Sequence, residues 1–263
     1  MPRSITDEEK ALAQRLLERG RAAMRQAYGY NEERVDDLAR AVGWAIANEP
    51  TFVALTDMAV DESGMGNKEG GAARRFKVAG ILRDALRQKS VDVIEELPEK
   101  GIVKYAKPAG VIAGLLPVTN PVVTMVAMAI NGVKCRDAVI FSPHPASRRT
   151  ALETTRILRT ALERQGAPAD LVQCIEKPSI PLAQELMSIC DLTIATGGAA
   201  MVKAAYSSGK PAYGVGAGNA TIIIDETANI EEAAARVRVK FVGGNPPDIM
   251  RRSAVPRIPP NGH

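Results

Sequence analysis

From residue 111 onward, short apolar segments alternate with amphipathic stretches, and this alternation constrains the fold more than any other feature of the sequence. The candidate strands are Val111–Leu116, Ala138–Phe141, Leu171–Ile175, Leu192–Ala195, Ala212–Val215 and Thr221–Ile224. Helix candidates lie between most of them, for example Leu152–Leu162 and Leu182–Met187. Strands separated by helices are typical of βαβ units, and continuously apolar strands are typical of a sheet covered on both faces. The sequence therefore predicts an α/β fold with a mostly parallel sheet.

The residues before this sheet carry a different pattern. Thr6 followed by Glu9 is a capping-box pattern, Asn31 can cap a second helix, and Pro50 suits the first turn of a third. Residues 91–107 then carry two short apolar segments joined through a Pro- and Gly-containing turn, which predicts a β-hairpin. We therefore expect one domain over residues 1–240, made of a helical part (1–90), a hairpin (about 91–107) and the sheet (111–240).

The last residues of the chain have a different composition. Residues 241–263 hold Pro246, Pro247, Pro256, Pro259 and Pro260, five of the 17 prolines, and show no apolar periodicity. Such a composition predicts a divergent, disordered tail.

Charge, cysteine content and hydropathy exclude several classes of function. The net charge is +4, charges of both signs are mixed, and aromatic residues make up 4% of the chain, which disfavours a nucleic-acid partner. The three cysteines form no Cys-x-x-Cys pair, so we expect neither a disulfide framework nor a metal site. No apolar run reaches membrane-spanning length and no signal peptide opens the chain, so we expect a cytoplasmic protein.

Polar residues follow the first predicted strand in the loop Pro117-Val118-Thr119-Asn120-Pro121. Proline fixes φ, so Asn120 is expected to be held rigidly between its two proline neighbours. A rigid carboxamide N–H is the donor that an oxyanion site needs, and losing one such donor costs about 10²–10³ in rate. The alternative role is a helix N-cap, which Asn often fills before a helix.

The loop after the second predicted strand again holds polar groups between prolines. Ser142, Pro143 and His144 open it, and their hydroxyl and imidazole groups could meet a ribose or a phosphate. The alternative for His144 is a surface turn residue. A catalytic base role is unsupported, because no carboxylate partner is evident nearby in the sequence.

Two glycine-rich loops follow later strands. Gly197 and Gly198, with Met201 just beyond them, lie between a strand and a helix, where a cofactor could approach the backbone and the helix N-terminus. Gly216 and Gly218 follow the next strand and suggest either close backbone approach or a plain loop between strands. Neither stretch is the six-residue dinucleotide fingerprint of ordinary Rossmann enzymes.

Taken together, these segments resemble the aldehyde dehydrogenase superfamily, and within it the CoA-acylating branch that contains the sulfoacetaldehyde, propionaldehyde and acetaldehyde enzymes. The resemblance runs from about residue 10 to about residue 240. Its motifs, in family order and spacing, are Glu62-Ser63-Gly64-Met65-Gly66, Pro108-Ala109-Gly110-Val111-Ile112, Pro117-Val118-Thr119-Asn120-Pro121, Ser142-Pro143-His144-Pro145, Thr196-Gly197-Gly198 and Gly214-Val215-Gly216-Ala217-Gly218-Asn219.

The resemblance implies a Rossmann-like, five-stranded nucleotide-binding domain and a reaction in which a small aldehyde, CoA and NAD or NADP give an acyl-CoA. In that family a cysteine thiolate attacks the aldehyde, hydride passes to the nucleotide, and CoA accepts the acyl group. By resemblance, Asn120 is the catalytic oxyanion donor. The cofactor-binding positions implied in the same way are Thr119, Ser142, Pro143, His144, Gly197, Gly198, Met201, Gly216 and Gly218.

Two departures from the family pattern matter. Gly214 stands where hydrolytic members carry a water-activating glutamate, if the alignment is not off by one residue, and glycine cannot act as a general base. The nucleophilic cysteine expected shortly after the helix that begins near Asn229 is absent, and so is the catalytic domain beyond it. The interpretation is a chain truncated before its catalytic cysteine, inactive alone, in which Cys135, Cys174 and Cys190 are buried structural thiols.

Other functions stay open at this point. The chain could be a non-catalytic nucleotide-binding or assembly module, forming a homo-oligomer or pairing with a full-length homologue through residues 91–107. A relative of the glutamyl phosphate reductases is a further option, which the Asn120 loop fits less well. The choice between NAD and NADP is open as well, because Pro145 stands near the usual position of the ribose-binding acidic residue.

Overall fold

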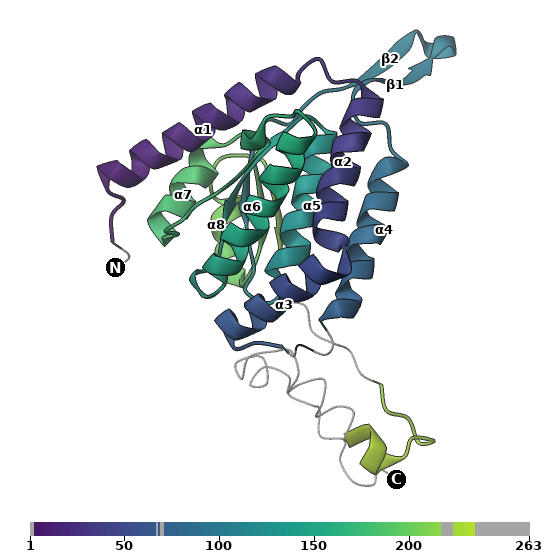
Figure 1. The fold of residues 1–263 in the computed structure, drawn as a ribbon, viewed down its shortest axis with the longest axis vertical. Coiled ribbons are helices and arrows are strands. Elements are labelled where there is room, and N and C mark those ends of the chain that lie inside the picture. Colours follow the sequence, from purple (N-terminus) through teal and green to yellow (C-terminus); the bar gives the residue numbers. More distant parts are fainter. Residues whose placement is uncertain (1–2, 67, 69–70, 217–222, 235–263) are drawn as a thin grey trace, which may run out of the picture.

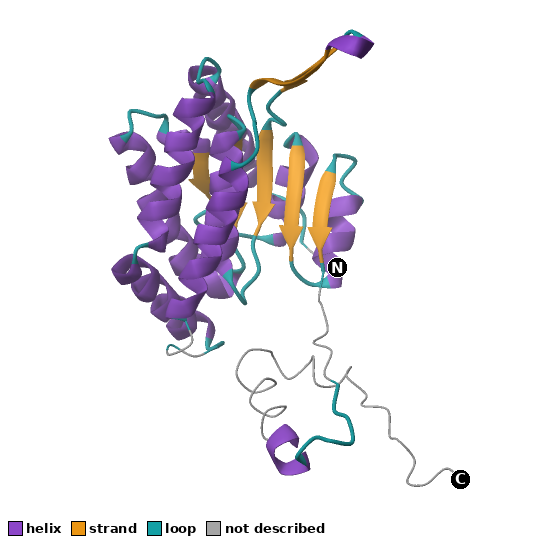
Figure 2. Ribbon diagram, turned by 90° about the vertical axis from the view of Figure 1, so that its right-hand side faces the viewer, coloured by secondary structure: helices purple, strands orange, loops and turns teal. Residues whose placement is uncertain are grey.

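The computed structural model describes residues 3–66, 68, 71–216 and 223–234. Its centre is a parallel sheet whose strands point the same way in Figure 2 and whose two faces are covered by helices. The α/β fold expected from the alternating pattern is confirmed.

Four helices precede the sheet: α1 (Asp7–Ala27), α2 (Glu32–Ala47), α3 (Glu49–Ser63) and α4 (Arg75–Leu86), the last after a 3₁₀ turn at Ala72–Arg74. The predicted caps are confirmed. Thr6 and Glu9 form a reciprocal capping box, the Asn31 side chain accepts the Arg34 N–H at 3.0 Å, and Pro50 lies in the first turn of α3. These side chains satisfy amides that the first helical turn leaves unpaired.

A hairpin follows the helices. Strands β1 (Asp92–Leu97) and β2 (Ile102–Ala106) pair antiparallel and are joined by the 3₁₀ turn Pro98–Lys100. The hairpin projects away from the helices and the sheet (Figures 1 and 2).

The sheet has the order β5-β4-β3-β6-β7, and all neighbouring strands are parallel. Its strands are β3 (Val111–Leu115), β4 (Ala138–Ser142), β5 (Val172–Cys174), β6 (Leu192–Thr196) and β7 (Ala212–Val215). Every residue of β3 and β4 is buried, which explains why these segments read as continuously apolar.

The connecting helices cover both faces. They are α5 (Pro121–Lys134), α6 (Arg148–Arg164), α7 (Ile180–Ile189) and α8 (Ala199–Tyr206), with 3₁₀ turns at Pro145–Ser147 and Ala169–Leu171. Helices α5 and α6 pack on one face with α2, α3 and α4 outside them, while α1, α7 and α8 lie on the other (Figure 1). Each crossover returns the chain to the same edge of the sheet, where the predicted loops begin.

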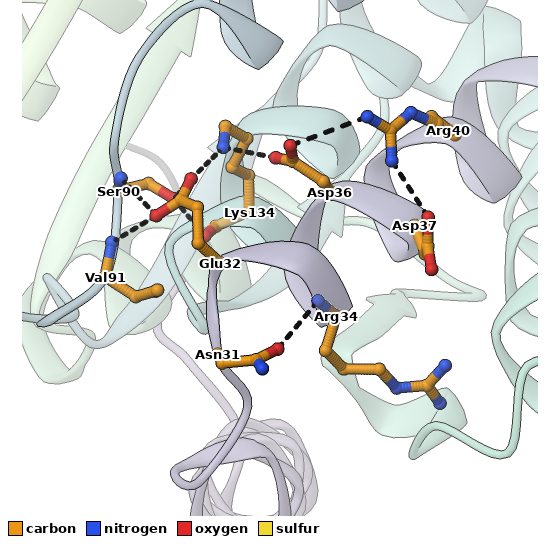
Figure 3. A network of polar contacts seen from close by, with 9 residues as sticks. All are labelled: Asn31, Glu32, Arg34, Asp36, Asp37, Arg40, Ser90, Val91 and Lys134. Carbon is orange, nitrogen blue, oxygen red and sulfur yellow. Dashed lines mark hydrogen bonds and ion pairs between the residues drawn. The ribbon is translucent and has the colours of Figure 1, made fainter.

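A buried polar network joins α2 to α5 and to the start of the hairpin (Figure 3). Lys134, at the end of α5, forms ion pairs with Glu32 and Asp36 of α2. Glu32 also accepts the N–H groups of Ser90 and Val91 at 2.9 and 3.2 Å. The buried lysine is paired with two half-buried carboxylates, so it carries no unpaired charge into the interior.

The sixth strand predicted at Thr221–Ile224 lies partly outside the described residues. Residues 217–222 lie outside the described part of the chain, and the described Ile223 and Ile224 form no strand and are exposed. Apolar composition alone predicted a covered strand, but within the described residues no strand or helix covers these side chains. Asn229 does cap a short helical segment, since its side chain accepts the Glu232 N–H at 3.0 Å. The tail predicted at 241–263 lies outside the described residues.

No helix in the described ranges is both long and apolar enough to cross a bilayer. The same residues contain no group of three or more His, Cys, Asp and Glu side chains arranged to hold a metal ion.

Candidate functional site

The parallel sheet brings the predicted loops to its carboxyl edge. Leu115 of β3 is in register with Ser142 of β4 and with Ala195 of β6, and Thr196 is in register with Val215 of β7. The loops that leave these strands therefore start at nearly the same level. Thr119, Asn120, Ser142, Pro143, His144, Gly197, Gly198 and Gly216 consequently share this edge, which is where open α/β sheets bind ligands.

Asn120 begins α5, but its side chain does not cap the helix. Only its backbone carbonyl is engaged, accepting from the Thr124 N–H at 3.4 Å and from the Thr124 hydroxyl at 2.8 Å. The carboxamide N–H donates no hydrogen bond within the described residues. The carboxamide oxygen cannot accept from the next residue either, because Pro121 has no N–H. The amide is therefore available to a ligand, and so is the hydroxyl of the exposed Thr119 beside it.

The second loop offers a hydroxyl more readily than an imidazole. Ser142 and Pro143 are buried, and the Ser142 hydroxyl donates to no group in the described part of the chain. His144 is exposed, and its Nδ1 accepts the Ala146 N–H at 3.1 Å, so this nitrogen holds the turn. This contact is the one expected if His144 is a surface turn residue, and it leaves only Nε2 for a ligand.

Two helix N-termini at this edge differ in whether they are occupied. At α6, the Glu62 carboxylate accepts the N–H groups of Arg149 and Thr150 at 2.7 and 2.8 Å, and the Thr150 hydroxyl at 2.8 Å. Burial raises the pKa of Glu62, but the hydrogen bonds from these amides and this hydroxyl outweigh it, so the pKa lies below its ordinary value. A carboxylate that stays ionised fills this N-terminus.

The N-terminus of α8 is open by comparison. Gly198 is its N-cap and contributes no side chain, and a Cβ built there would meet no atom within 4 Å. The first two amides of the helix, those of Ala199 and Ala200, have no acceptor among the described residues, whereas the Met201 N–H bonds back to Gly198. Met201 packs beneath the turn, 3.6 Å from the position a Gly197 Cβ would take. Unpaired amides on an open turn are suited to an anion such as a pyrophosphate.

Gly214 lies inside β7, packed against α8. A Cβ at this position would lie 2.7 Å from Val202 Cγ1 and 2.9 Å from Tyr206 Cε2, and the Tyr206 hydroxyl accepts the Gly214 N–H at 3.0 Å. Close packing therefore leaves no room for a side chain here. Gly216 is described and unobstructed, whereas Gly218 lies outside the described residues.

None of the three cysteines lies beside Asn120. Cys135 follows α5, whose 14 residues make it about 20 Å long, so this thiol is at the far end from Asn120. Cys190 is buried just before β6, at the amino edge of the sheet, and Cys174 ends β5, which is separated from β3 by β4. Burial raises the pKa of all three thiols, to about 12 for Cys174 and Cys190, so they stay neutral.

A small pocket opens beside Asn120. Its lining combines α3, the loop after it, the 3₁₀ turn before α4 and the start of α5: Phe52, Thr56, Ala59, Val60, Ser63, Met65, Arg74, Val118, Thr119, Asn120, Pro121 and Val122. The larger depression on the surface lies elsewhere, between α1, α6 and β5, around Arg19 and Arg159. The geometry and the unpaired donors point to the smaller pocket as part of the site. The sequence placed Ser63 and Met65 in a motif but gave no signal that they or Arg74 would approach Asn120.

The Pro108–Ile112 motif lies at the opposite edge of the sheet and has a structural role. Gly110 has φ +120°, and a Cβ there would lie 2.4 Å from Asp191 Oδ2. The Gly110 N–H donates to Asp137 at 2.9 Å and the Val111 N–H to Asp191 at 2.8 Å. Two buried or half-buried carboxylates thus bind the start of β3, and only glycine fits between them.

Comparison with known proteins identifies one family along most of the chain. The profile of the aldehyde dehydrogenase family matches residues 51–245. The chain is 44% identical over 222 residues to a sulfoacetaldehyde dehydrogenase of Acholeplasma sp, covering 84% of this chain and 46% of that protein. It is 39% identical over 220 residues to the succinate-semialdehyde dehydrogenase (acetylating) of Clostridium kluyveri, covering 83% and 48%. The chain therefore spans about half the length of the curated relatives it matches.

Solved structures show the same fold. An acetylating aldehyde dehydrogenase from Geobacillus thermoglucosidasius superposes with a TM-score of 0.82 at 36% identity, covering 90% of this chain and 53% of that one. A propionaldehyde dehydrogenase from Rhodopseudomonas palustris with bound propionyl-CoA superposes with a TM-score of 0.70 at 33% identity, covering 86% and 50%.

Proposed function

Because the chain belongs to the aldehyde dehydrogenase family, we propose that it is the dinucleotide-binding half of a CoA-acylating aldehyde dehydrogenase. The complete reaction would convert an aldehyde, CoA and NAD⁺ or NADP⁺ into an acyl-CoA, the reduced nucleotide and a proton. The names of the relatives support this branch, since they include acylating and acetylating enzymes and one structure with a bound acyl-CoA.

The residues at the carboxyl edge fit a pyridine dinucleotide. The open α8 N-terminus, with Gly197 and Gly198 before it, would hold the pyrophosphate, and Met201 supports this turn from below. Ser142 and Thr119 offer hydroxyls for a ribose, Pro143 and His144 shape the same loop, and Gly216 leaves space beyond β7. When bound, the nucleotide would accept hydride from the substrate. The open α8 N-terminus is the single observation that carries this assignment.

Asn120 would act on the aldehyde itself. Its unengaged carboxamide, at the start of α5, is placed to donate a hydrogen bond to the carbonyl oxygen as negative charge develops there. Rigid donors of this kind need no reorganisation during the reaction, which is why they lower the barrier.

The packing around Gly214 favours acyl transfer to a thiol over hydrolysis. No side chain fits at this position, so no general base can act on water from here. An acyl group held near this edge would persist until the CoA thiol attacked it. Cys135 lies at the far end of α5 from Asn120, and desolvation raises the pKa of the half-buried Cys174 and the buried Cys190, so both thiols stay protonated. We therefore propose that the chain alone does not carry the acyl group.

Nucleotide binding is the direct test. The purified chain should bind NADH or NADPH and shift or enhance the fluorescence of the reduced nicotinamide in a saturable manner. Excess AMP should compete, because the adenosine half shares the loop at Ser142. Saturable binding that AMP reverses supports the proposal, whereas absence of binding by a chain whose circular dichroism shows it folded contradicts it.

A second role follows from the hairpin. Ile102, Val103 and Tyr105 of β2 are 45%, 47% and 62% exposed, and the hairpin projects from the domain (Figure 1). We propose that these apolar residues contact another copy of the chain or a full-length homologue. A Val103→Lys and Tyr105→Lys double variant should lower the mass measured by light scattering relative to the parent chain. An unchanged mass would count against this surface.

A further inference from the structure

The pocket beside Asn120 contains polar groups of two kinds. Thr56 and Ser63, both on α3, are already engaged, because their hydroxyls donate to the backbone carbonyls of Phe52 and Ala59 at 2.8 and 2.6 Å. Asn120 and Thr119 donate no hydrogen bond to any described residue. The unengaged donors therefore lie on the α5 side of the pocket.

Arg74 supplies a positive charge to the same pocket. Its side chain is half-buried, and among the described residues its guanidinium forms neither an ion pair nor a hydrogen bond. Nη2 would lie 3.7 Å from a Cβ built on Gly66, which places the guanidinium against the loop that ends α3. No Asp or Glu is among the described residues that line the pocket.

The neighbouring Arg75 shows the contrast. Its guanidinium pairs with Glu49 at 2.9 Å and lies over the ring of Phe76, 4.5 Å from the ring centroid. Arg75 is not part of the pocket lining. Two adjacent arginines thus have different surroundings: Arg75 has a carboxylate partner, and Arg74 faces a pocket whose described lining contains no carboxylate.

A half-buried guanidinium without a carboxylate is suited to bind an anion. Its planar fork of donors matches a carboxylate or a sulfonate, with two parallel hydrogen bonds. We infer that Arg74 is a specificity-determining residue that binds the acid group of a short anionic aldehyde, whose carbonyl end faces Asn120. This inference rests on the proposed function, because it takes the pocket to be the aldehyde site. Two relatives are named for aldehydes of this chemistry, one bearing a sulfonate and one a carboxylate.

The test uses a probe that carries the acid group but cannot react. The ¹⁵N-labelled chain is titrated with 2-hydroxyethanesulfonate while the Asn120 side-chain amide and the Arg74 Nε–H are followed by NMR. Both signals should shift along one saturable curve. The neutral diol ethane-1,2-diol should shift neither at the same concentrations, because it lacks the charge that Arg74 would recognise.

Variants at the two arginines separate the roles. Arg74→Gln should weaken sulfonate binding by about tenfold or more, the loss expected for a charge-assisted hydrogen bond. Arg74→Lys should bind with intermediate affinity, because the charge remains and the fork is lost, and it serves if Arg74→Gln does not fold. Arg75→Gln is the matched control and should leave the affinity unchanged.

The inference is overturned if Arg74→Gln binds the sulfonate as tightly as the parent chain does, or, should that variant not fold, if Arg74→Lys does so. It is also overturned if Arg75→Gln loses as much affinity as Arg74→Gln, or if the neutral diol binds as tightly as the sulfonate. Titration of the same samples with NADH and NADPH separates this result from the proposed function. Nucleotide binding without a response to the sulfonate rejects the role of Arg74 alone. A response to the sulfonate that depends on Arg74, without nucleotide binding, rejects the proposed function and retains the anion site.

Discussion

At the scale of single residues, the site depends on which polar groups the protein leaves without an internal partner. Asn120 occupies an N-cap position but does not use its side chain as a cap. Gly198 is the N-cap of α8 and has no side chain, and the Ala199 and Ala200 amides have no acceptor among the residues that the structure describes. Unpaired donors at the edge of a parallel sheet are available for a ligand at no cost in broken internal hydrogen bonds.

An aspartate at position 198 should block the nucleotide. In Gly198→Asp the carboxylate would cap α8 and repel the pyrophosphate, so affinity for NADH and NADPH should fall by about tenfold or more. Fluorescence titration measures the loss. Gly29→Asp is the matched control, since a Cβ at Gly29 also meets nothing within 4 Å but lies between α1 and α2. Similar affinity in the two variants would contradict the assignment of the α8 N-terminus.

The carboxyl of Asp137 should make stability depend on pH. Burial, with a smaller contribution from the nearby Asp191, raises its pKa from the ordinary 3.8 to about 7 and outweighs the N–H groups of Gly110 and Ala109, which lower it. Between these pH values the folded chain retains a proton that the unfolded chain has lost. The contribution to the free energy of unfolding is therefore complete below about pH 4 and lost as pH rises through about 7.

Asp137→Asn should remove this component. The amide oxygen can still accept the Gly110 N–H but does not titrate, so the free energy of unfolding should fall less between pH 4 and 7 than in the parent chain. Urea denaturation at a series of pH values measures the slope. A parent chain whose stability rises steadily across this window, in parallel with the variant, would show that Asp137 ionises normally.

At the scale of elements, a side chain from one helix caps the N-terminus of another. Glu62 lies near the end of α3, and its carboxylate takes the place of an N-cap at α6, 87 positions later in the chain. Lys134 acts similarly at the far end of α5, where it binds α2 through Glu32 and Asp36. The outer helices are therefore attached to the helices on the sheet by charged contacts as well as by apolar packing, and this orients the loops at both edges.

Loss of the Glu62 carboxylate should destabilise the protein. Glu62→Ala leaves the Arg149 and Thr150 amides of α6 without their acceptor, which should lower the free energy of unfolding by about 1–2 kcal/mol. Urea denaturation is the measurement. Glu153→Ala on the same helix removes an ion pair with the exposed Arg156 and should cost only a few tenths of a kcal/mol. Equal losses in the two variants would argue against a capping role.

At the scale of the whole molecule, the described fold would supply one side of a reaction site under the proposed function. Under the proposed function the carboxyl edge carries donors for a nucleotide and an oxyanion, whereas Cys135 and Cys190 lie toward the other edge and Cys174 ends the outer strand β5, separated from β3 by β4. The matched relatives are about twice as long as this chain, and the thiol expected of the family is not among the cysteines here. The chain is therefore expected to bind the nucleotide without catalysing the reaction.

The purified chain should bind nucleotide without turning over. Incubation with CoA, NAD⁺ or NADP⁺ and an aldehyde such as sulfoacetaldehyde or propionaldehyde should produce no increase in absorbance from reduced nicotinamide. The physical reason is that no thiolate lies near Asn120, because burial keeps Cys174 and Cys190 protonated. Formation of NADH or NADPH that requires both CoA and aldehyde would show that this expectation is wrong.

The elements of the fold could be predicted because their signals are local. Alternating apolar segments identified the five strands of the sheet to within about a residue, and the caps at Thr6 and Asn31 marked helix starts. At Thr221–Ile224 the same reasoning predicted a strand, but the described Ile223 and Ile224 form none, because apolar character alone does not say whether a neighbouring strand exists. The loops at Asn120, Ser142 and Gly197 could be recognised by their prolines and glycines, because proline restricts the backbone conformation and glycine widens it wherever they occur.

By itself, the sequence determined the order of strands and helices and the loops that would meet at one edge, since periodicity and turn chemistry act between residues close in the chain. Only the tertiary structure decided how polar groups were paired across long separations. Glu62 closes the N-terminus of α6, whereas no described side chain caps α8, and Arg74 lies beside Asn120 with no carboxylate partner among the described residues. These outcomes depend on how helices distant in the sequence pack, and packing determines which donors remain for a ligand.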